Sequence, residues 1–465
     1  MGIEHIQSLL FRYAFAGLAT LAVLLVLFLT GWLIYKKVFH GQKKLRKKYL
    51  VLGAVSFVYL FIVACAVFVD RTGYEEGVQS LFASYRHAWY YWRLADWMNI
   101  VLNILLFVPF GFLLPLWNKK FNQFYITVPS GFMCTLMIEV LQYVLKLGVF
   151  EWDDILNNTI GTLLGYCALQ IVTCIFKRKE LKKALLCGVP YLAVAAVFGG
   201  IFLAYAVQPY GNLELAYYAK LAPKSISVTV GNLPDQDQKA NVYKQVPVSQ
   251  TEARAAADAL FAAAGADADD STEFYEDGWF SIESTDGDHT FSMDTENGTY
   301  EFEEFAYFWM DSPLRPSTPL PAEEVRLALQ AYGVDLPPDC PVQVEEGDCY
   351  MFSPEMETQN GLVRGTLYCY INESGDIVGI TNDIVTLQLV SAEDIISVQE
   401  AAERIQSGKY SAEYLPASCT LVINDCEISF SEDSKGFYQP VYLFTCEVTS
   451  DGETTETHIP IPALK

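Results

Sequence analysis

The sequence has few residues of the kinds that carry metal or covalent chemistry. It contains five histidines, and no two cysteines have the Cys-x-x-Cys spacing of a zinc ribbon. None of the histidines lies in a long apolar stretch: they are His5, His40, His87, His289 and His458. No Ser-His-Asp or Cys-His set is recognisable either. We therefore expect no metal site, no cofactor and no covalent catalysis, which leaves proton transfer or ligand binding by acids.

Acids are scarce in the first half of the chain, and bases are scarce in the second. Before residue 209 there are 10 acidic and 19 basic residues, and after it 45 and 12, so the halves carry +9 and −33 and sum to −24. The acidic half argues against nucleic acid as a partner. The first half has the long apolar runs and basic loops of a protein embedded in a lipid bilayer.

Six apolar segments reach the length of about 20 residues that a helix needs to cross a membrane. They are Tyr13–Tyr35, Tyr49–Val69, Trp97–Trp117, Phe124–Leu147, Ile155–Phe176 and Ala184–Val207. The first is too long for a signal-peptide core and should be a retained anchor. The predicted fold class is an all-α bundle of six transmembrane helices, followed by a soluble α+β region of helix-plus-antiparallel-sheet units. We expect an anchor and basic loop at 1–48, a membrane domain at 49–180, a last span at 181–209 and the acidic region at 210–465.

Basic residues predict how the bundle is oriented. They gather between spans one and two, three and four, and five and six, as in Lys43 to Lys48, Lys119-Lys120 and Lys177-Arg178-Lys179. Such loops are usually cytoplasmic. The alternate loops hold acids, among them Glu151, Asp153 and Asp154. Both termini and residues 210–465 should therefore lie outside the cytoplasm.

Polar residues follow helical spacing in three of the spans. Residues three or four positions apart share one face of a helix, which predicts these stripes: Asp96, Asn99 and Asn103; Glu139 and Gln142; Asp154, Asn158, Gly161 and Gly165. Asp153 and Asn157 lie beside the third stripe. The glycines allow a neighbouring helix to approach closely.

The predicted orientation places all of these groups in the outer half of the membrane. By helical rise, Asn103 lies roughly 9 Å and Glu139 about 12 Å below the outer ends of their spans. Pro109, with Gly111 and Pro115, should interrupt the third span just below them. A carboxylate at membrane depth is costly and therefore a candidate functional group. We predict one polar pocket open to the outside; the alternative is that the same groups only hold the helices together.

Three motifs in this region resemble signatures of the VanZ-like membrane protein family. They are Asn103-Ile-Leu-Leu-Phe-Val-Pro109-Phe-Gly111-Phe-Leu-Leu-Pro115, then Ile138-Glu139-Val-Leu-Gln142, and then Phe150-Glu-Trp-Asp153-Asp154-Ile-Leu-Asn157-Asn158-Thr-Ile-Gly161-Thr-Leu-Leu-Gly165-Tyr166. The resemblance covers about residues 50–180. Many members carry an arginine before the aspartate motif, where this chain has Lys146. The resemblance implies a bacterial cell-membrane protein, and the name-giving member is associated with low-level teicoplanin resistance.

The acidic half contains three expected helices, each followed by strand-like sequence. Ser249-Gln-Thr-Glu252 and Ser397-Val-Gln-Glu400 are capping boxes, and Pro321 suits a first helical turn. The last unit loosely resembles PepSY-like or YycI-like extracytoplasmic regulatory modules. The six cysteines of this half permit either disulfides or free buried thiols. The acidic run from Asp267 to Asp277 is expected to be a solvated loop, with calcium binding as the alternative.

Three functions remain open. The first is a non-enzymatic envelope protein whose outward polar pocket and outer domain bind a cell-wall precursor, a glycopeptide or an envelope protein. The second is a membrane enzyme that acts on a lipid-linked envelope intermediate, with Glu139 or Asp154 as general base. The third is a proton-coupled transporter, which would also need polar groups toward the cytoplasmic side, where the spans have few.

Overall fold

A computed structural model describes two compact units, Met1–Lys224 and Ser225–Lys465. The described residues are 20, 46–68, 77–178, 180–217, 225–231, 239–276, 278–308, 319–337, 340–345, 348–358, 361–410, 418–450 and 452–465. The expected first span, Tyr13–Tyr35, lies outside them apart from Thr20.

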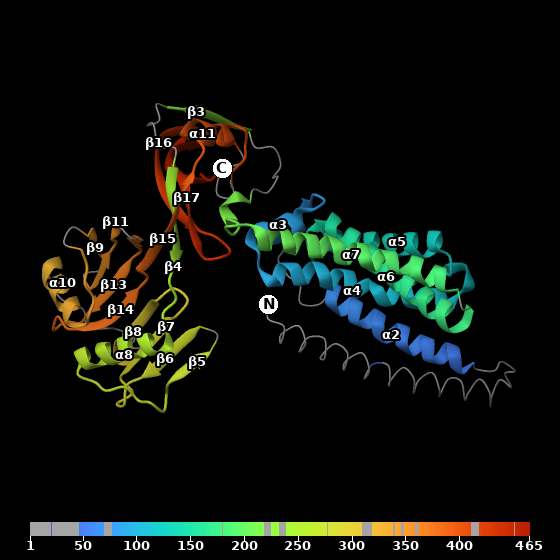
Figure 1. The fold of residues 1–465 in the computed structure, drawn as a ribbon, viewed down its shortest axis with the longest axis horizontal. Helices are drawn as coiled ribbons and strands as arrows, with labels where there is room; N and C mark the ends of the chain where they lie inside the picture. Colours follow the sequence, from blue (N-terminus) through green and yellow to red (C-terminus); the bar gives the residue numbers. More distant parts are fainter. Residues whose placement is uncertain are drawn as a thin grey trace. The chain divides into compact units, whose positions relative to one another are not determined.

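The described residues of the first unit include a bundle of five long apolar helices, each long enough to cross a membrane (Figure 1). They are α2 (Lys47–Phe68), α4 (Leu94–Trp117), α5 (Phe124–Val144), α6 (Trp152–Thr173, continued by the π-helical turn Cys174–Arg178) and α7 (Leu181–Val207). These correspond to the second to sixth expected spans. Helix α6 contacts α4, α5 and α7, which makes it the central element of the unit.

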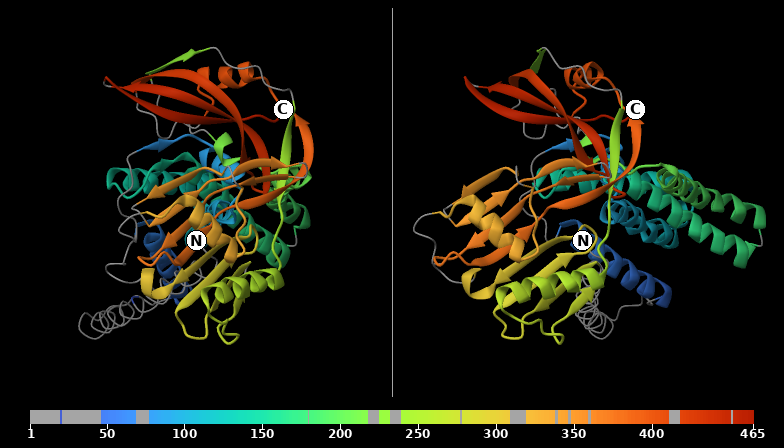
Figure 2. Two further views of the ribbon diagram at one scale, coloured as in Figure 1. Left: turned by 90° about the vertical axis from the view of Figure 1, so that its left-hand side faces the viewer. Right: turned by 60° about the vertical axis from the view of Figure 1, so that its left-hand side comes forward.

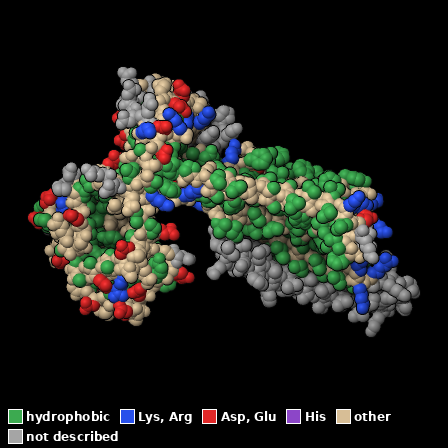
Figure 3. Space-filling model, viewed as in Figure 1, with side chains coloured by type: hydrophobic (Ala, Val, Ile, Leu, Met, Phe, Trp, Pro, Cys, Tyr) green, Lys and Arg blue, Asp and Glu red, His purple; other side chains and the backbone are tan. Residues whose placement is uncertain are grey.

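Short elements connect the long helices. Helix α3 (Ala83–Tyr91) precedes α4, and 3-10 turns occupy Lys119–Phe121 and Glu214–Ala216. Strands β1 (Val78–Gln79) and β2 (Phe150–Glu151) pair in parallel, which joins the segment before α3 to the segment before α6. Hydrophobic side chains cover much of the visible bundle surface, and Lys and Arg gather at the end where α2, α5 and α7 begin (Figure 3).

The expected interruption of the third span is wrong. Pro109 and Pro115 both lie inside α4, which is continuous from Leu94 to Trp117. A proline removes one backbone N–H but keeps a φ near −65°, so a helix supported by its neighbours can continue through it.

The second unit is rich in sheet, with two eight-stranded sheets (Figures 1 and 2). The first has the order β5 (Phe274–Glu276), β6 (Trp279–Glu283), β7 (His289–Asp294), β8 (Thr299–Glu304), β14 (Ile377–Asn382), β13 (Leu367–Ile371), β10 (Cys349–Phe352) and β9 (Val342–Glu345), and its described pairs are antiparallel. Helices α8 (Gln250–Ala264) and α10 (Ala322–Ala331) bury Leu260, Phe261 and Leu329 in a core with its strands.

The second sheet has the order β11 (Glu355–Thr358), β12 (Gly361–Arg364), β15 (Val385–Asp394), β4 (Lys239–Gln245), β17 (Phe437–Ser450), β16 (Ser418–Glu432) and β3 (Ser225–Val230), with β18 (Glu453–Pro462) paired to β17. Strands β3 and β16 pair in parallel. Helix α11 (Val398–Gln406) packs Ala401 and Ile405 into the core of this sheet, and a short helix, α9 (Phe305–Phe308), follows β8. The three expected helices are thus present, but their strands merge into two shared sheets.

Helix capping in the second unit follows the sequence pattern. Ser249 accepts from the Glu252 amide while the Glu252 side chain accepts from the Ser249 amide, the reciprocal capping box. Ser397 accepts from the Glu400 amide, and Pro321 lies at the N-cap of α10. None of the eleven cysteines forms a disulfide in the structure, and the six of this unit are buried, which agrees with the alternative of buried thiols.

Candidate functional site

The polar residues of α4 and α6 meet at the end of the bundle where α6 begins. Asn103 donates from Nδ2 to Asp154 Oδ1 at 2.5 Å. Further along the same contact, a Cβ at Gly161 would overlap with the Ile104 carbonyl, and a Cβ at Gly165 would overlap with the Val108 carbonyl. A Cβ at Gly111, on α4, would overlap with the Thr162 carbonyl of α6. The glycine contacts bring the two backbones close enough for Asn103 to reach Asp154.

A second set of contacts joins α5 to α6. Asn158 Nδ2 donates to Thr135 Oγ1 at 2.8 Å, and the Glu151 amide donates to Glu139 Oε2 at 3.0 Å. Glu139 and Asn158 are only 2% and 5% exposed. Gln142 points elsewhere, since its Nε2 donates to the Val67 carbonyl of α2 at 3.0 Å. We call Asn103, Thr135, Glu139, Asp154 and Asn158 the polar cluster.

Helix α3 is attached to the start of α6 by the remaining polar residues. The Asp153 carboxylate accepts from the Phe82 amide at 2.5 Å and from the Ser84 amide at 2.8 Å. These amides are unpaired donors at a helix N-terminus, where a negative charge is favourable. Tyr85 OH donates to Asn157 Oδ1 at 2.5 Å, and both Asp153 and Asn157 are 1% exposed. Asp153 and Asn157 therefore hold α3 against the start of α6.

The backbone is strained around this region. Three non-glycine residues in the described part of the chain have positive φ: Phe82 at 65°, Trp92 at 50° and Lys146 at 56°. The first two flank α3, and Lys146 follows α5. Left-handed conformations of bulky residues cost free energy and persist only where the surroundings enforce them. At Phe82, the hydrogen bond from its amide to Asp153 helps to hold this conformation.

Burial and two nearby acids change the pKa of the Tyr85 hydroxyl. Burial, followed by the charges of Asp153 and Asp154, raises the pKa of Tyr85 to about 12. The hydroxyl therefore stays protonated near neutral pH and remains a donor to Asn157.

Two predicted site residues of α4 lie apart from the polar cluster. Asn99 is exposed. Asp96 faces His87, with Oδ2 at 3.6 Å from Nδ1, and His87 stacks on Tyr91 at 4.1 Å between ring centroids. The first stripe therefore divides, because Asn103 joins the cluster while Asp96 belongs to the aromatic surroundings of α3.

Sequence reasoning missed the partners that α3 and its neighbours supply. Ser84, Tyr85, Thr135 and Glu151 all contact predicted site residues, and Ser84 Oγ donates to Glu151 Oε2 at 3.2 Å. The signal for α3 is weak because its N-cap residue, Phe82, has no side-chain cap. The cap is Asp153, 71 positions later.

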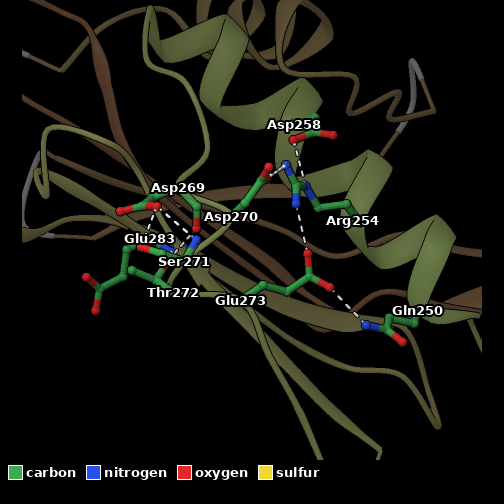
Figure 4. Close-up of polar contacts among 9 residues, drawn as sticks. All are labelled: Gln250, Arg254, Asp258, Asp269, Asp270, Ser271, Thr272, Glu273 and Glu283. Carbon is green, nitrogen blue, oxygen red and sulfur yellow. Dashed lines mark hydrogen bonds and ion pairs between the residues drawn. The ribbon is translucent and has the colours of Figure 1, made fainter.

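The acidic run of the second unit surrounds one arginine (Figure 4). Arg254 of α8 contacts Asp270 at 2.7 Å, Glu273 at 2.8 Å and Asp258 at 3.0 Å, and these carboxylates raise its pKa. Asp269 accepts from the Ser271 amide and hydroxyl. Among the described residues, no three His, Cys, Asp or Glu side chains are grouped as metal ligands would be.

Comparison with known proteins identifies the membrane region. Residues 22–177 match the family model VanZ/LLP1. The chain is 28% identical over 72 residues to Protein VanZ of Enterococcus faecium, which covers 15% of this chain and 43% of that protein. The chain thus spans less than half the length of that relative. An uncharacterized protein of Eubacterium rectale, known from a crystal structure, aligns with 51% of this chain and 86% of its own at 10% identity, with a TM-score of 0.27.

Proposed function

We propose, from the VanZ-like domain that residues 22–177 form, that this multi-pass membrane protein acts in the bacterial cell envelope without catalysing a reaction. In this proposal it contributes to tolerance of teicoplanin-type glycopeptides or to cell-wall homeostasis. The observation that carries it is the meeting of polar side chains from α4, α5 and α6 at one end of the bundle.

The proposed orientation places that end outside the cell. Helices α4 and α6 end, and α5 and α7 begin, beside basic segments such as Lys119-Lys120 and Lys182-Lys183. The polar cluster belongs to the opposite ends of these helices. Basic loops favour the cytoplasm, so the cluster, α3 and residues 210–465 would face outward, with Tyr13–Tyr35 as the first of six spans.

The polar cluster would then lie toward the side of the membrane from which envelope ligands arrive. Burying several acids and amides at bilayer depth is costly unless function or packing offsets the cost. Packing explains part of this set, because Asp153 and Asn157 hold α3. Glu139, Asp154 and Asn158 instead make contacts among α4, α5 and the start of α6, and we propose that they bind the ligand, a cell-wall precursor or a glycopeptide.

The second unit would bind a peptide, protein or cell-wall component outside the membrane. Its strong negative charge disfavours acidic partners. Residues 397–449 loosely resemble PepSY-like or YycI-like modules, and from this resemblance we predict that they bind a protein in a regulatory role.

Catalysis by an intramembrane carboxylate is the less favoured alternative. Glu139 accepts from a backbone amide and Asp154 accepts from Asn103. Each of these bonds joins two segments of the bundle, which is a structural role that needs no proton transfer. Consumption of a lipid-linked intermediate by the purified protein would promote this alternative.

Teicoplanin tolerance of cells that express single variants tests the proposal. We expect Glu139→Gln and Asp154→Asn to lower tolerance at equal membrane abundance, because each removes a charge from the polar cluster. Asp96→Asn is the matched control, since Asp96 lies on α4 but faces His87, and it should keep wild-type tolerance. Wild-type behaviour of all three variants would leave the cluster with a structural role only.

A further inference from the structure

A cavity of about 370 Å³ lies within the second unit, beside strands of the second sheet. Strands β4, β11 and β16 supply its lining, which consists of Lys239, Ala240, Asn241, Glu357, Ile428 and Phe430. Its volume falls within the range of ordinary small-molecule sites, about 300–1,000 Å³. Two charged side chains of opposite sign, one amide and two large apolar side chains thus surround one space.

A chain of hydrogen bonds fixes the polar side of this cavity. Asn241 Nδ2 donates to Tyr243 OH at 3.1 Å, and Tyr243 OH donates to Glu357 Oε1 at 2.8 Å. Tyr243 is only 1% exposed, and burial raises its pKa to about 12, so its hydroxyl stays protonated and remains a donor near neutral pH. These bonds connect an amide of β4 to a carboxylate of β11.

The polar side chains of the cavity retain capacity for a ligand. Among the described residues, Glu357 accepts only from Tyr243, and an ionised carboxylate has lone pairs for further donors. Asn241 uses its donor on Tyr243, so the group that it offers a ligand is the acceptor Oδ1. Both side chains therefore favour a ligand with N–H donors, and the carboxylate favours a positive charge.

Lys239 supplies the opposite charge. Its Nζ lies 3.7 Å from Asp394 Oδ1, and the two side chains are 67% and 65% exposed. The free energy of such an exposed ion pair is small. Lys239 can therefore turn to a carboxylate group of a ligand at little cost.

The remaining lining is apolar, and the cavity has about the size of a dipeptide. Ile428 and Phe430 are two positions apart on β16, so their side chains lie on one face of the strand. The Phe430 ring packs edge-on against Tyr243, with 5.0 Å between ring centroids. A cube of 370 Å³ has an edge of about 7 Å, and two extended residues also span about 7 Å.

We infer that this cavity binds a short peptide with free ends and apolar side chains. The terminal ammonium group donates to Glu357 and to Asn241 Oδ1, and the terminal carboxylate contacts Lys239. The peptide side chains pack on Ile428 and Phe430. This inference rests on the proposed function, since it gives a site and a ligand class to the binding role of the second unit.

Calorimetric titration of the full-length protein in phosphatidylcholine nanodiscs tests the site, with empty nanodiscs as the reference. The probe is leucyl-leucine. N-acetyl-leucyl-leucine lacks the ammonium group, leucyl-leucinamide lacks the carboxylate, and glycyl-glycine lacks the apolar side chains. We expect saturable binding of leucyl-leucine and affinities lower by about tenfold or more for each analogue, because each loses one charged contact or the apolar contact.

Variants assign each end of the probe to a residue. Glu357→Gln should weaken leucyl-leucine binding by about tenfold and remove most of its advantage over N-acetyl-leucyl-leucine. Lys239→Met should have the same effect relative to leucyl-leucinamide. Glu427→Gln is the matched control, because it loses the same charge as Glu357→Gln but lies beside Ile428 on the opposite face of β16; it should bind as wild type does. Thermal melting of each variant establishes that it is folded.

Three results would overturn the inference: no saturable binding beyond that of empty nanodiscs, equal affinity for leucyl-leucine and its analogues, or wild-type affinity in folded Glu357→Gln or Lys239→Met. These results are separate from failure of the proposed function. Dipeptide binding that depends on Glu357, together with unchanged teicoplanin tolerance in Glu139→Gln and Asp154→Asn, would refute the proposed function and leave the site. Lost tolerance without dipeptide binding would do the reverse.

Discussion

Removing the charge of Asp153 should release α3 from the bundle. Its two carboxylate oxygens accept from the Phe82 amide at 2.5 Å and from the Ser84 amide at 2.8 Å, and the side chain is 1% exposed. Asparagine keeps one acceptor oxygen but places an NH2 group against the other amide. The variant Asp153→Asn therefore loses one charge-assisted bond and leaves a buried donor unpaired.

The size of this effect follows from those two contacts. A hydrogen bond to a charged group contributes about 1.5–3 kcal/mol, and an unpaired buried donor adds a further penalty, so docking of α3 should weaken by roughly 2–4 kcal/mol. With about 1.36 kcal/mol for each factor of ten, local opening should become about 30 to 1,000 times more frequent.

Hydrogen–deuterium exchange of the peptide that spans residues 80–92 measures this opening. The protein is compared in nanodiscs as wild type, Asp153→Asn and Asp154→Asn. Asp154 contacts Asn103 on α4, so its variant should leave α3 exchange unchanged. Exchange of Asp153→Asn at the wild-type rate would refute the assignment of Asp153 as the cap of α3.

Three further perturbations probe packing, capping and electrostatics. Gly161→Ala should lower the melting temperature, because its Cβ would overlap with an α4 carbonyl, whereas Gly199→Ala should not, since no described atom outside the backbone of its own helix lies within 4 Å of the added atom. Ser249→Ala should cost the second unit about 1 kcal/mol in chemical denaturation through loss of the cap. Burial and the charge of Glu301 raise the pKa of Glu303, so its ionised form opposes folding at neutral pH and this cost disappears as pH falls. Glu303→Gln should therefore raise the melting temperature at pH 7, with a gain that vanishes by about pH 4. An equal gain at pH 7 and pH 4 would show that the charge of Glu303 does not oppose folding.

Local sequence patterns predicted the elements of the first unit well. Apolar length located the five described spans, although α4 begins at Leu94 and α7 at Leu181, three residues before the expected starts. These extra turns are amphipathic or basic, so an apolar window excludes them. Pro109 led to the wrong prediction of a helix break. The helix continues because neighbouring helices support it, and the sequence of one helix does not reveal that support.

The site was only partly predictable, because many of its contacts link distant positions. Helical spacing correctly suggested that Asp154 and Gly161 share a face, and the structure places both against α4. No spacing rule, however, relates Asp153 to Phe82, and helix α3 was therefore missed. Asn99 has the right spacing to Asn103 but lies on the exposed side of its helix.

In the second unit, the presence of strands after each helix was predictable, and strand partners were not. Turn residues such as Gly298 and Gly375, both with positive φ, mark the hairpin ends. Pairing of β8 with β14 and of β3 with β16 brings together strands from different parts of the chain. Disulfide formation also depends on the distances between cysteines, and these distances follow from which strands pair.

The orientation of the bundle is the claim on which the outward-facing site depends. Alkaline phosphatase fused after Tyr210, beyond the end of α7, and after Lys120, between α4 and α5, reports it directly. We predict high activity for the fusion at Tyr210 and low activity for the fusion at Lys120, since the enzyme matures only outside the cytoplasm. The opposite result would place the polar cluster on the cytoplasmic side and contradict the account.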